Sequence, residues 1–207
     1  MTTMALAARS ALARQLQLAR RGRTWIQVLS GRHARVDAWQ HYPRHDAVDA
    51  AGRWQFYFHA HAAVAPDHAP LRKELGHVHL FRRSPAGQLT HLCALVLDAR
   101  GMPLGWTANN QWVTGGRWYA AATLVRWLSC FELRLHGPLA GLALWLCDLV
   151  ALYRQPLAQM LHQRDARLAQ HRSHQGLTQA QALADRSVSV WQSFSIRWPA
   201  DALAAAS

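Results

Sequence analysis

The sequence has few cysteines, no acidic residue near its start and no long apolar run. Its three cysteines, Cys93, Cys130 and Cys147, show no CxxC spacing, and an odd number leaves one thiol unpaired in any disulfide scheme. This pattern excludes a small secreted scaffold held by disulfides. It favours a reducing compartment, and we therefore expect a cytoplasmic protein.

The shortness of the apolar runs argues against a membrane span. The longest run, residues 139–153, falls short of the roughly 20 residues that a spanning helix needs and is interrupted by Asp148. Residues 1–8 show neither the continuous apolar stretch nor the cleavage site of a signal peptide. We predict a buried helix at 139–153 and no membrane span.

Acidic residues are absent before Asp37, whereas seven arginines precede it and supply much of the formal net charge of +12. Arginine contacts to phosphate dominate affinity for nucleic acids. No helix-turn-helix, RNP or zinc-finger pattern accompanies these arginines, however. The sequence thus argues against a nucleic-acid partner and leaves a small molecule or an acidic protein open, with no indication of oligomeric state.

The chain has the length and composition of one globular domain, because 207 residues at 51% hydrophobic content can bury a sizeable core. We predict a basic helix and linker over residues 1–36, a globular domain over 37–200 and a tail over 201–207. The apolar stripe of the predicted helix at 3–20 is mostly alanine, so it buries little area. We expect this helix to be dispensable for folding.

Alternating hydrophobicity predicts a meander of antiparallel strands in the first half of the chain, and helical periodicity predicts helices in the second. A turn at 98–101 joins two strands, with Gly101 at positive φ, and a capping box of Thr178 and Gln181 opens a late helix. Residues 32–53 are polar and turn-rich. The expected strands are 55–61, 76–81, 90–97, 104–113 and an edge strand at 193–198, and the expected helices are 118–134, 139–154 and 156–171. The fold class is α+β, an antiparallel β-meander packed against C-terminal helices in a single domain.

Two strands carry paired histidines. Successive side chains of a strand point to opposite faces, so His59 and His61 share a face with Tyr57, and His77 shares one with His79. Cross-strand neighbours lie about 4.5–5.5 Å apart at Cβ. Four imidazoles therefore converge if the two strands pair.

This constellation predicts a metal site. Imidazole is a common ligand of zinc, iron and copper, so His59, His61, His77 and His79 are the expected ligands of a divalent transition metal. Glu74 and Tyr57 are the candidate catalytic residues, because both can handle protons beside the metal. The alternative is a cluster of hydrogen-bonded histidines in a non-catalytic accessory or interaction protein.

Further polar residues are candidates for the surroundings of the site. His41, Asp46 and Asp49 can orient imidazoles or stabilise turns, and Asn110 and Trp112 suit either a polar ligand or turn hydrogen bonds. His91 can face the same cavity, although a histidine at the start of a strand is more often at the surface. The loop at 62–75 is longer than a hairpin needs, as in a lid or a solvated excursion.

Three motifs carry a resemblance to a known family: His41-Tyr42-Pro43, residues 55–61 (QFYFHAH), and Glu74 followed by residues 76–81 (GHVHLF). With these motifs the chain resembles an uncharacterised bacterial family known only as a domain of unknown function, over about residues 40 to 190. The resemblance implies no activity and no catalytic residues. Where that family often has Glu-His-Gly-His-x-His, this chain has Leu75, which removes a fifth imidazole.

The sequence leaves the role of the metal open. A centre with a free coordination position fits a metal-dependent enzyme of unknown reaction, whereas a closed centre of four imidazoles fits a sensor or accessory protein. The number of protein ligands distinguishes these two functions.

Overall fold

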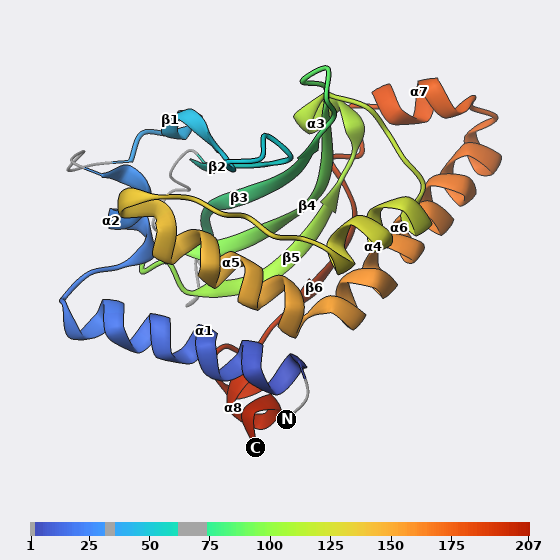
Figure 1. The fold of residues 1–207 in the computed structure, drawn as a ribbon. Helices are drawn as coiled ribbons and strands as arrows, with labels where there is room; N and C mark the ends of the chain where they lie inside the picture. The colour runs from blue at the N-terminus through green and yellow to red at the C-terminus, as the bar shows by residue number, and fades with distance from the viewer. Residues whose placement is uncertain (1–2, 32–35, 62–73) are drawn as a thin grey trace, which may run out of the picture.

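A computed structural model of the chain describes residues 3–31, 36–61 and 74–207. Its centre is a six-stranded sheet in which every strand pairs antiparallel with the next one in sequence (Figure 1). The strands are β1 (Tyr42–Val48), β2 (Trp54–Ala60), β3 (Glu74–Arg83), β4 (Leu89–Asp98), β5 (Pro103–Asn109) and β6 (Val190–Ser195). The predicted α+β meander is confirmed.

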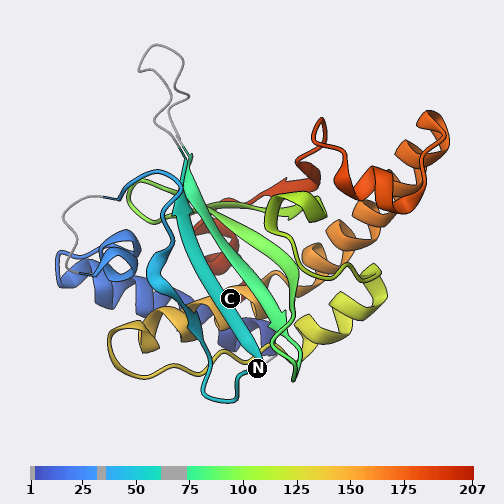
Figure 2. The same cartoon turned by 90° about the horizontal axis from the view of Figure 1, so that it is seen from above.

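Helices cover one face of this sheet and extend beyond one side of it. Figure 1 shows α5 across the sheet, α1 beneath it and the long α6 at the side, and Figure 2 shows the same arrangement from above. The helices are α1 (Thr3–Arg20), α2 (Trp25–Ser30), α3 (Gln111–Thr114), α4 (Ala121–Ser129), α5 (Ala140–Leu152), α6 (Arg154–Gln175), α7 (Gln179–Ala184) and α8 (Ala200–Ala206), with a 3-10 turn at Gly137–Leu139 before α5.

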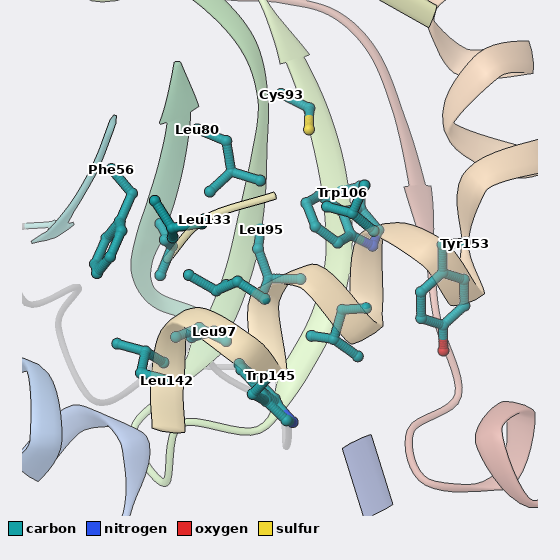
Figure 3. Packing of buried hydrophobic residues seen from close by; sticks show 14 of the residues in the cluster. Phe56, Leu80, Cys93, Leu95, Leu97, Trp106, Leu133, Leu142, Trp145 and Tyr153 are labelled. Carbon is teal, nitrogen blue, oxygen red and sulfur yellow. The ribbon is translucent and has the colours of Figure 1, made fainter. Parts of the chain in front are cut away.

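The core lies between the sheet and α5. Leu80, Leu95 and Trp106 project from the strands toward Leu142 and Trp145 of α5, and none of the five retains exposed surface (Figure 3). Full burial of one such side chain is worth about 1.5–3 kcal/mol relative to exposure. Because strand side chains alternate, the histidines of β2 and β3 are left on the other face.

Several local predictions are confirmed. Gly101 has a φ of 73° in the turn between β4 and β5, and Thr178 with Gln181 forms the capping box of α7. The last strand pairs only with β5 and is an edge strand, as expected. The helix at 139–153 is buried, since seven residues of α5 belong to the core.

Three predictions are wrong. The helix expected over 118–134 spans only α4 (Ala121–Ser129), and residues 131–136 form an irregular segment that buries Leu133 in the core. The fourth strand ends at Asn109 rather than Val113, because the Asn110 side chain accepts a hydrogen bond from the backbone of Gln111 and starts α3 instead. The segment 32–53, expected to be polar and turn-rich, contains β1. Its sequence hides a strand because β1 is polar and its register with β2 slips between Tyr42 and Ala47, so alternation is lost.

The N-terminal helix is packed against the body. Ala8 and Ala11 have no exposed surface, and α1 contacts α5 and α8. Arg14 forms an ion pair with Asp148 of α5 at 3.1 Å. Most of the expected tail at 201–207 belongs to α8 (Ala200–Ala206). The boundaries at 36 and 200 stay predictions.

In the described ranges, no single helix combines the length and apolar character needed to cross a membrane. Residues 137–152 and 154–175 meet these criteria only as a pair, which is bent by 73°. The three cysteines are free thiols: Cys93 is buried, Cys147 half-buried and Cys130 exposed. The loop predicted at 62–75 lies almost wholly outside the described residues.

Candidate metal centre

The pairing of β2 with β3 brings the histidines together. His59 lies opposite His77, and Tyr57 lies opposite His79, in an antiparallel register. The predicted adjacency of the two His-x-His pairs on one face is confirmed. Gly76 permits this approach, because a Cβ at that position would lie 2.0 Å from the carbonyl oxygen of His59.

Three of the imidazoles form a compact group. His59, His61 and His77 each offer a ring nitrogen, and the three nitrogens all lie within 4.8 Å of one another. In a tetrahedral zinc site with bonds of about 2.0–2.1 Å, the ligand nitrogens are roughly 3.4 Å apart. Small rotations of the rings would reach that spacing, so this group could hold a metal ion.

The environment keeps His59 neutral. Burial, followed by the neighbouring imidazoles of His61 and His77, lowers the pKa of His59 from 6.5 to about 4. A metal binds the neutral imidazole, because the proton and the metal compete for one lone pair. At pH 7, therefore, His59 needs to lose no proton before it can act as a ligand.

Glu74 links two members of the group. Its Oε1 atom accepts a hydrogen bond from Nδ1 of His61 at 2.7 Å and lies 3.1 Å from Nε2 of His77. The hydrogen bond from His61, then the contact with His77, holds the pKa of Glu74 well below its usual range. A carboxylate on Nδ1 orients the His61 ring and leaves its Nε2 free for a metal.

The fourth predicted ligand, His79, stands apart from this group. It is fully buried, and its Nδ1 shares a hydrogen bond of 3.1 Å with Nε2 of His91. Burial, then the imidazole of His91, lowers the pKa of His79 well below its ordinary value. The structure thus gathers three of the four predicted ligands into one compact group.

A bulge in β4 explains why His91 faces the site. Leu80 pairs with Cys93 but Phe81 pairs with His91, so one extra residue reverses the alternation. Burial, then the charge of Arg164, lowers the pKa of His91 to about 3. The side chain is half-buried and lies beside His79.

Two imidazole nitrogens of the site are among the buried side-chain atoms of the described residues that lack a hydrogen bond. Nε2 of His77 is close to Glu74 but not aligned for a hydrogen bond, and Nε2 of His79 has no partner in the described part of the chain. More than nine in ten buried polar groups are normally paired. In the same described ranges, Nε1 of four buried tryptophans away from the site is equally unpaired, so the compact grouping of the imidazoles, and not their unpaired atoms, identifies the candidate site.

His41, Asp46 and Tyr57 lie beside the three-histidine group. The His41 ring stacks on Tyr57 with centroids 3.7 Å apart, and its Nδ1 lies 2.9 Å from Asp46. Asp46 also accepts a hydrogen bond from Gln55 at 2.7 Å. Burial, then the charge of Asp46, raises the pKa of Tyr57 to about 12, so the phenol keeps its proton at neutral pH.

Trp39 is a member of the site that sequence reasoning missed. Its ring stacks on His61 at 5.4 Å and meets His59 edge-on at 5.6 Å, although 64% of the residue is exposed. Within the described ranges, Trp39 and Asp46 are the two non-glycine residues at positive φ. Strained backbone of this kind is concentrated at functional sites. No pattern in the polar segment around Trp39 signals this role.

Three other predicted residues use their polar groups elsewhere. Oδ1 of Asp49 accepts hydrogen bonds from two backbone amides of the turn between β1 and β2. Nδ2 of Asn110 donates to three carbonyl oxygens in and after α7, and Nε1 of Trp112 donates to Val188. The structure does not bring Asp49, Asn110 and Trp112 to the three-histidine group.

Comparison with known proteins gives one match. The model of a family described as a domain of unknown function (DUF6969) matches residues 5–196. This match confirms the predicted resemblance and extends it beyond residues 40–190 to include most of α1. No curated protein and no solved structure matches the chain.

Proposed function

The chain belongs to this DUF6969 family, and we propose that it is a divalent transition-metal-binding protein whose centre consists of His59, His61 and His77. One observation carries the proposal: three imidazole nitrogens from two paired strands lie within 4.8 Å of one another. Nitrogen ligands suit zinc, iron and copper, whereas calcium and magnesium require oxygen ligands.

Three protein ligands support a metal-dependent enzyme rather than a closed structural centre. Structural zinc sites have four protein ligands, whereas catalytic sites have three and leave a position open. A metal at such a position acts as a Lewis acid and lowers the pKa of bound water. Glu74, which contacts His61 and His77, and Tyr57, which lies beside His59, are the candidate residues for proton transfer.

The alternative function is a non-catalytic protein in which the histidines form a hydrogen-bonded cluster. The bonds between His79 and His91 and between His61 and Glu74 favour it. A cluster built only for hydrogen bonding would not need three imidazole nitrogens within 4.8 Å of one another, as those of His59, His61 and His77 are. This difference favours a metal.

Metal analysis of the untagged protein tests the proposal. We expect about one zinc, iron or copper ion per chain, lost in the double variant His59→Gln/His61→Gln. The matched control is His162→Gln/His174→Gln, which removes two exposed histidines of α6. If wild-type protein carries no metal and gains no thermal stability from zinc, iron(II), copper or nickel, the hydrogen-bonded cluster is correct.

A further inference from the structure

A second functional feature lies at the other end of β2 and β3. β2 runs from Trp54 to Ala60 and β3 returns from Glu74 to Arg83, so the histidines are at one end of the pair and Arg83 at the other. Five residues of strand from Trp54 to His59 span about 17 Å. Changes at this second end can therefore be made without altering the candidate metal centre.

Three hollows that share lining residues begin near this end and extend along α4 toward α6. Their volumes are about 690, 160 and 440 Å³. Arg82 and Trp127 line both the first and the second, and Arg117 and Tyr119 line both the second and the third. Figure 2 shows the supporting segments in succession: the turn between β1 and β2, the turn between β3 and β4, and α4. We call this the arginine groove.

The groove carries an excess of positive charge. Six arginines line it: Arg53, Arg82, Arg83, Arg117, Arg134 and Arg172. Three acidic side chains also line it, which leaves an excess of three positive charges. Asp49 binds backbone amides, Glu132 pairs with Arg134, and Asp165 pairs with Arg164. Arg53 and Arg117 are exposed. The groove therefore attracts an anion with several charges.

Aromatic rings alternate with these arginines. The Arg82 guanidinium lies 4.7 Å above the Trp54 ring, and that of Arg117 lies 4.9 Å above Tyr119. Trp127, half-buried, meets Tyr119 edge-on at 5.0 Å. Arginine planes and aromatic rings are the surfaces on which unpaired bases stack. The anion that fits this groove also carries planar groups.

We propose that the arginine groove binds single-stranded nucleic acid, with phosphates at the arginines and bases against Trp127 and Tyr119. A duplex hides its base faces and would leave these rings unused. A lipid bilayer presents a broad surface that does not follow a concave groove. The sequence argued against a nucleic-acid partner because no known binding motif accompanies the arginines before Asp37. The groove consists of other arginines, which are scattered along the chain.

Binding of a labelled 12-nucleotide single strand, followed by fluorescence anisotropy at several salt concentrations, tests the proposal. The variant Arg53→Gln/Arg117→Gln/Arg134→Gln should weaken binding about tenfold or more and lower the salt slope by about 2, because each phosphate contact contributes about 0.7. The control Arg20→Gln/Arg21→Gln/Arg100→Gln removes the same charge from exposed positions outside the groove and should change affinity less than about twofold.

Stacking is tested with Trp127→Leu, which should weaken binding about 5- to 150-fold with an unchanged salt slope. Circular dichroism and an unchanged melting temperature verify that each variant is folded. The proposal would be overturned if both triple variants lost the same affinity, or if the wild-type protein did not bind the strand at low salt. It would also be overturned if heparin bound as tightly as the oligonucleotide and Trp127→Leu left heparin binding unchanged. Preferential binding to anionic vesicles would overturn it as well. All these results are independent of the metal proposal, which metal content alone decides.

Discussion

Replacement of His61 and of His79 by glutamine should have opposite consequences for metal binding, although both histidines lie on the same face of paired strands. His61 belongs to the compact group of three nitrogens, whereas His79 is held by His91. His61→Gln should abolish the gain in melting temperature that zinc gives the metal-free protein. His79→Gln should preserve that gain but lower the melting temperature with and without zinc.

The magnitudes follow from burial and from mass action. Free zinc at 100 times its Kd stabilises the folded protein by about 2.7 kcal/mol, which for a chain of this size raises Tm by about 5–11 °C. His79→Gln leaves Nε2 of His91 without its hydrogen-bond partner, which destabilises the fold by about 1–3 kcal/mol. That cost lowers Tm by about 2–12 °C in both states.

Differential scanning fluorimetry of untagged protein, with and without zinc, measures both quantities. His162→Gln on the exposed face of α6 is the control for the loss of a histidine and should change neither. If His79→Gln removes the zinc response as completely as His61→Gln does, His79 is a ligand and the three-histidine centre is refuted in favour of four. A zinc response that survives His61→Gln refutes the centre altogether.

Three further predictions concern the fold around the site. The metal-free protein should be less stable at pH 5 than at pH 7.5. Folding lowers the pKa values of His59 and His91 from 6.5 to about 4 and about 3, so the unfolded chain takes up protons at a higher pH than the folded chain does. The neutral histidines therefore stabilise the folded protein fully above pH 6.5, and this stabilisation is lost as pH falls toward 4. A melting temperature that stays constant or rises on acidification would contradict this reasoning. Gly76→Ala should destabilise the protein by about 1–3 kcal/mol or more and remove metal binding, because the added Cβ would clash with the backbone of His59. Gly141→Ala, which adds a Cβ in open space on α5, is the control in the same melting experiments and should be tolerated. Deletion of residues 1–20 should lower Tm or solubility, because α1 buries Ala8, Ala11 and Leu18. The sequence alone predicted that this helix is dispensable for folding. An unchanged melting temperature in the truncated protein would support that earlier expectation.

The sequence was sufficient to predict the features that depend on local periodicity. Alternation identified β2 and β3, and it assigned His59 and His77 to one face because the period of a strand fixes side-chain direction wherever the register is regular. The same reasoning located the turn at Gly101 and the capping box at Thr178, since both depend on a few neighbouring residues.

The tertiary structure decided whatever depends on irregular backbone or on partners distant in sequence. A bulge in β4 turned His91 toward His79, and the irregular β1 brought His41 and Asp46 beside the histidines. Trp39 reached His61 through a backbone at positive φ, which its sequence does not suggest. Period-2 reasoning fails at each such point, because one inserted or left-handed residue reverses the direction of every side chain that follows. Local pattern therefore determined which imidazoles share a face, and long-range packing determined which three of them are close enough to share one ion.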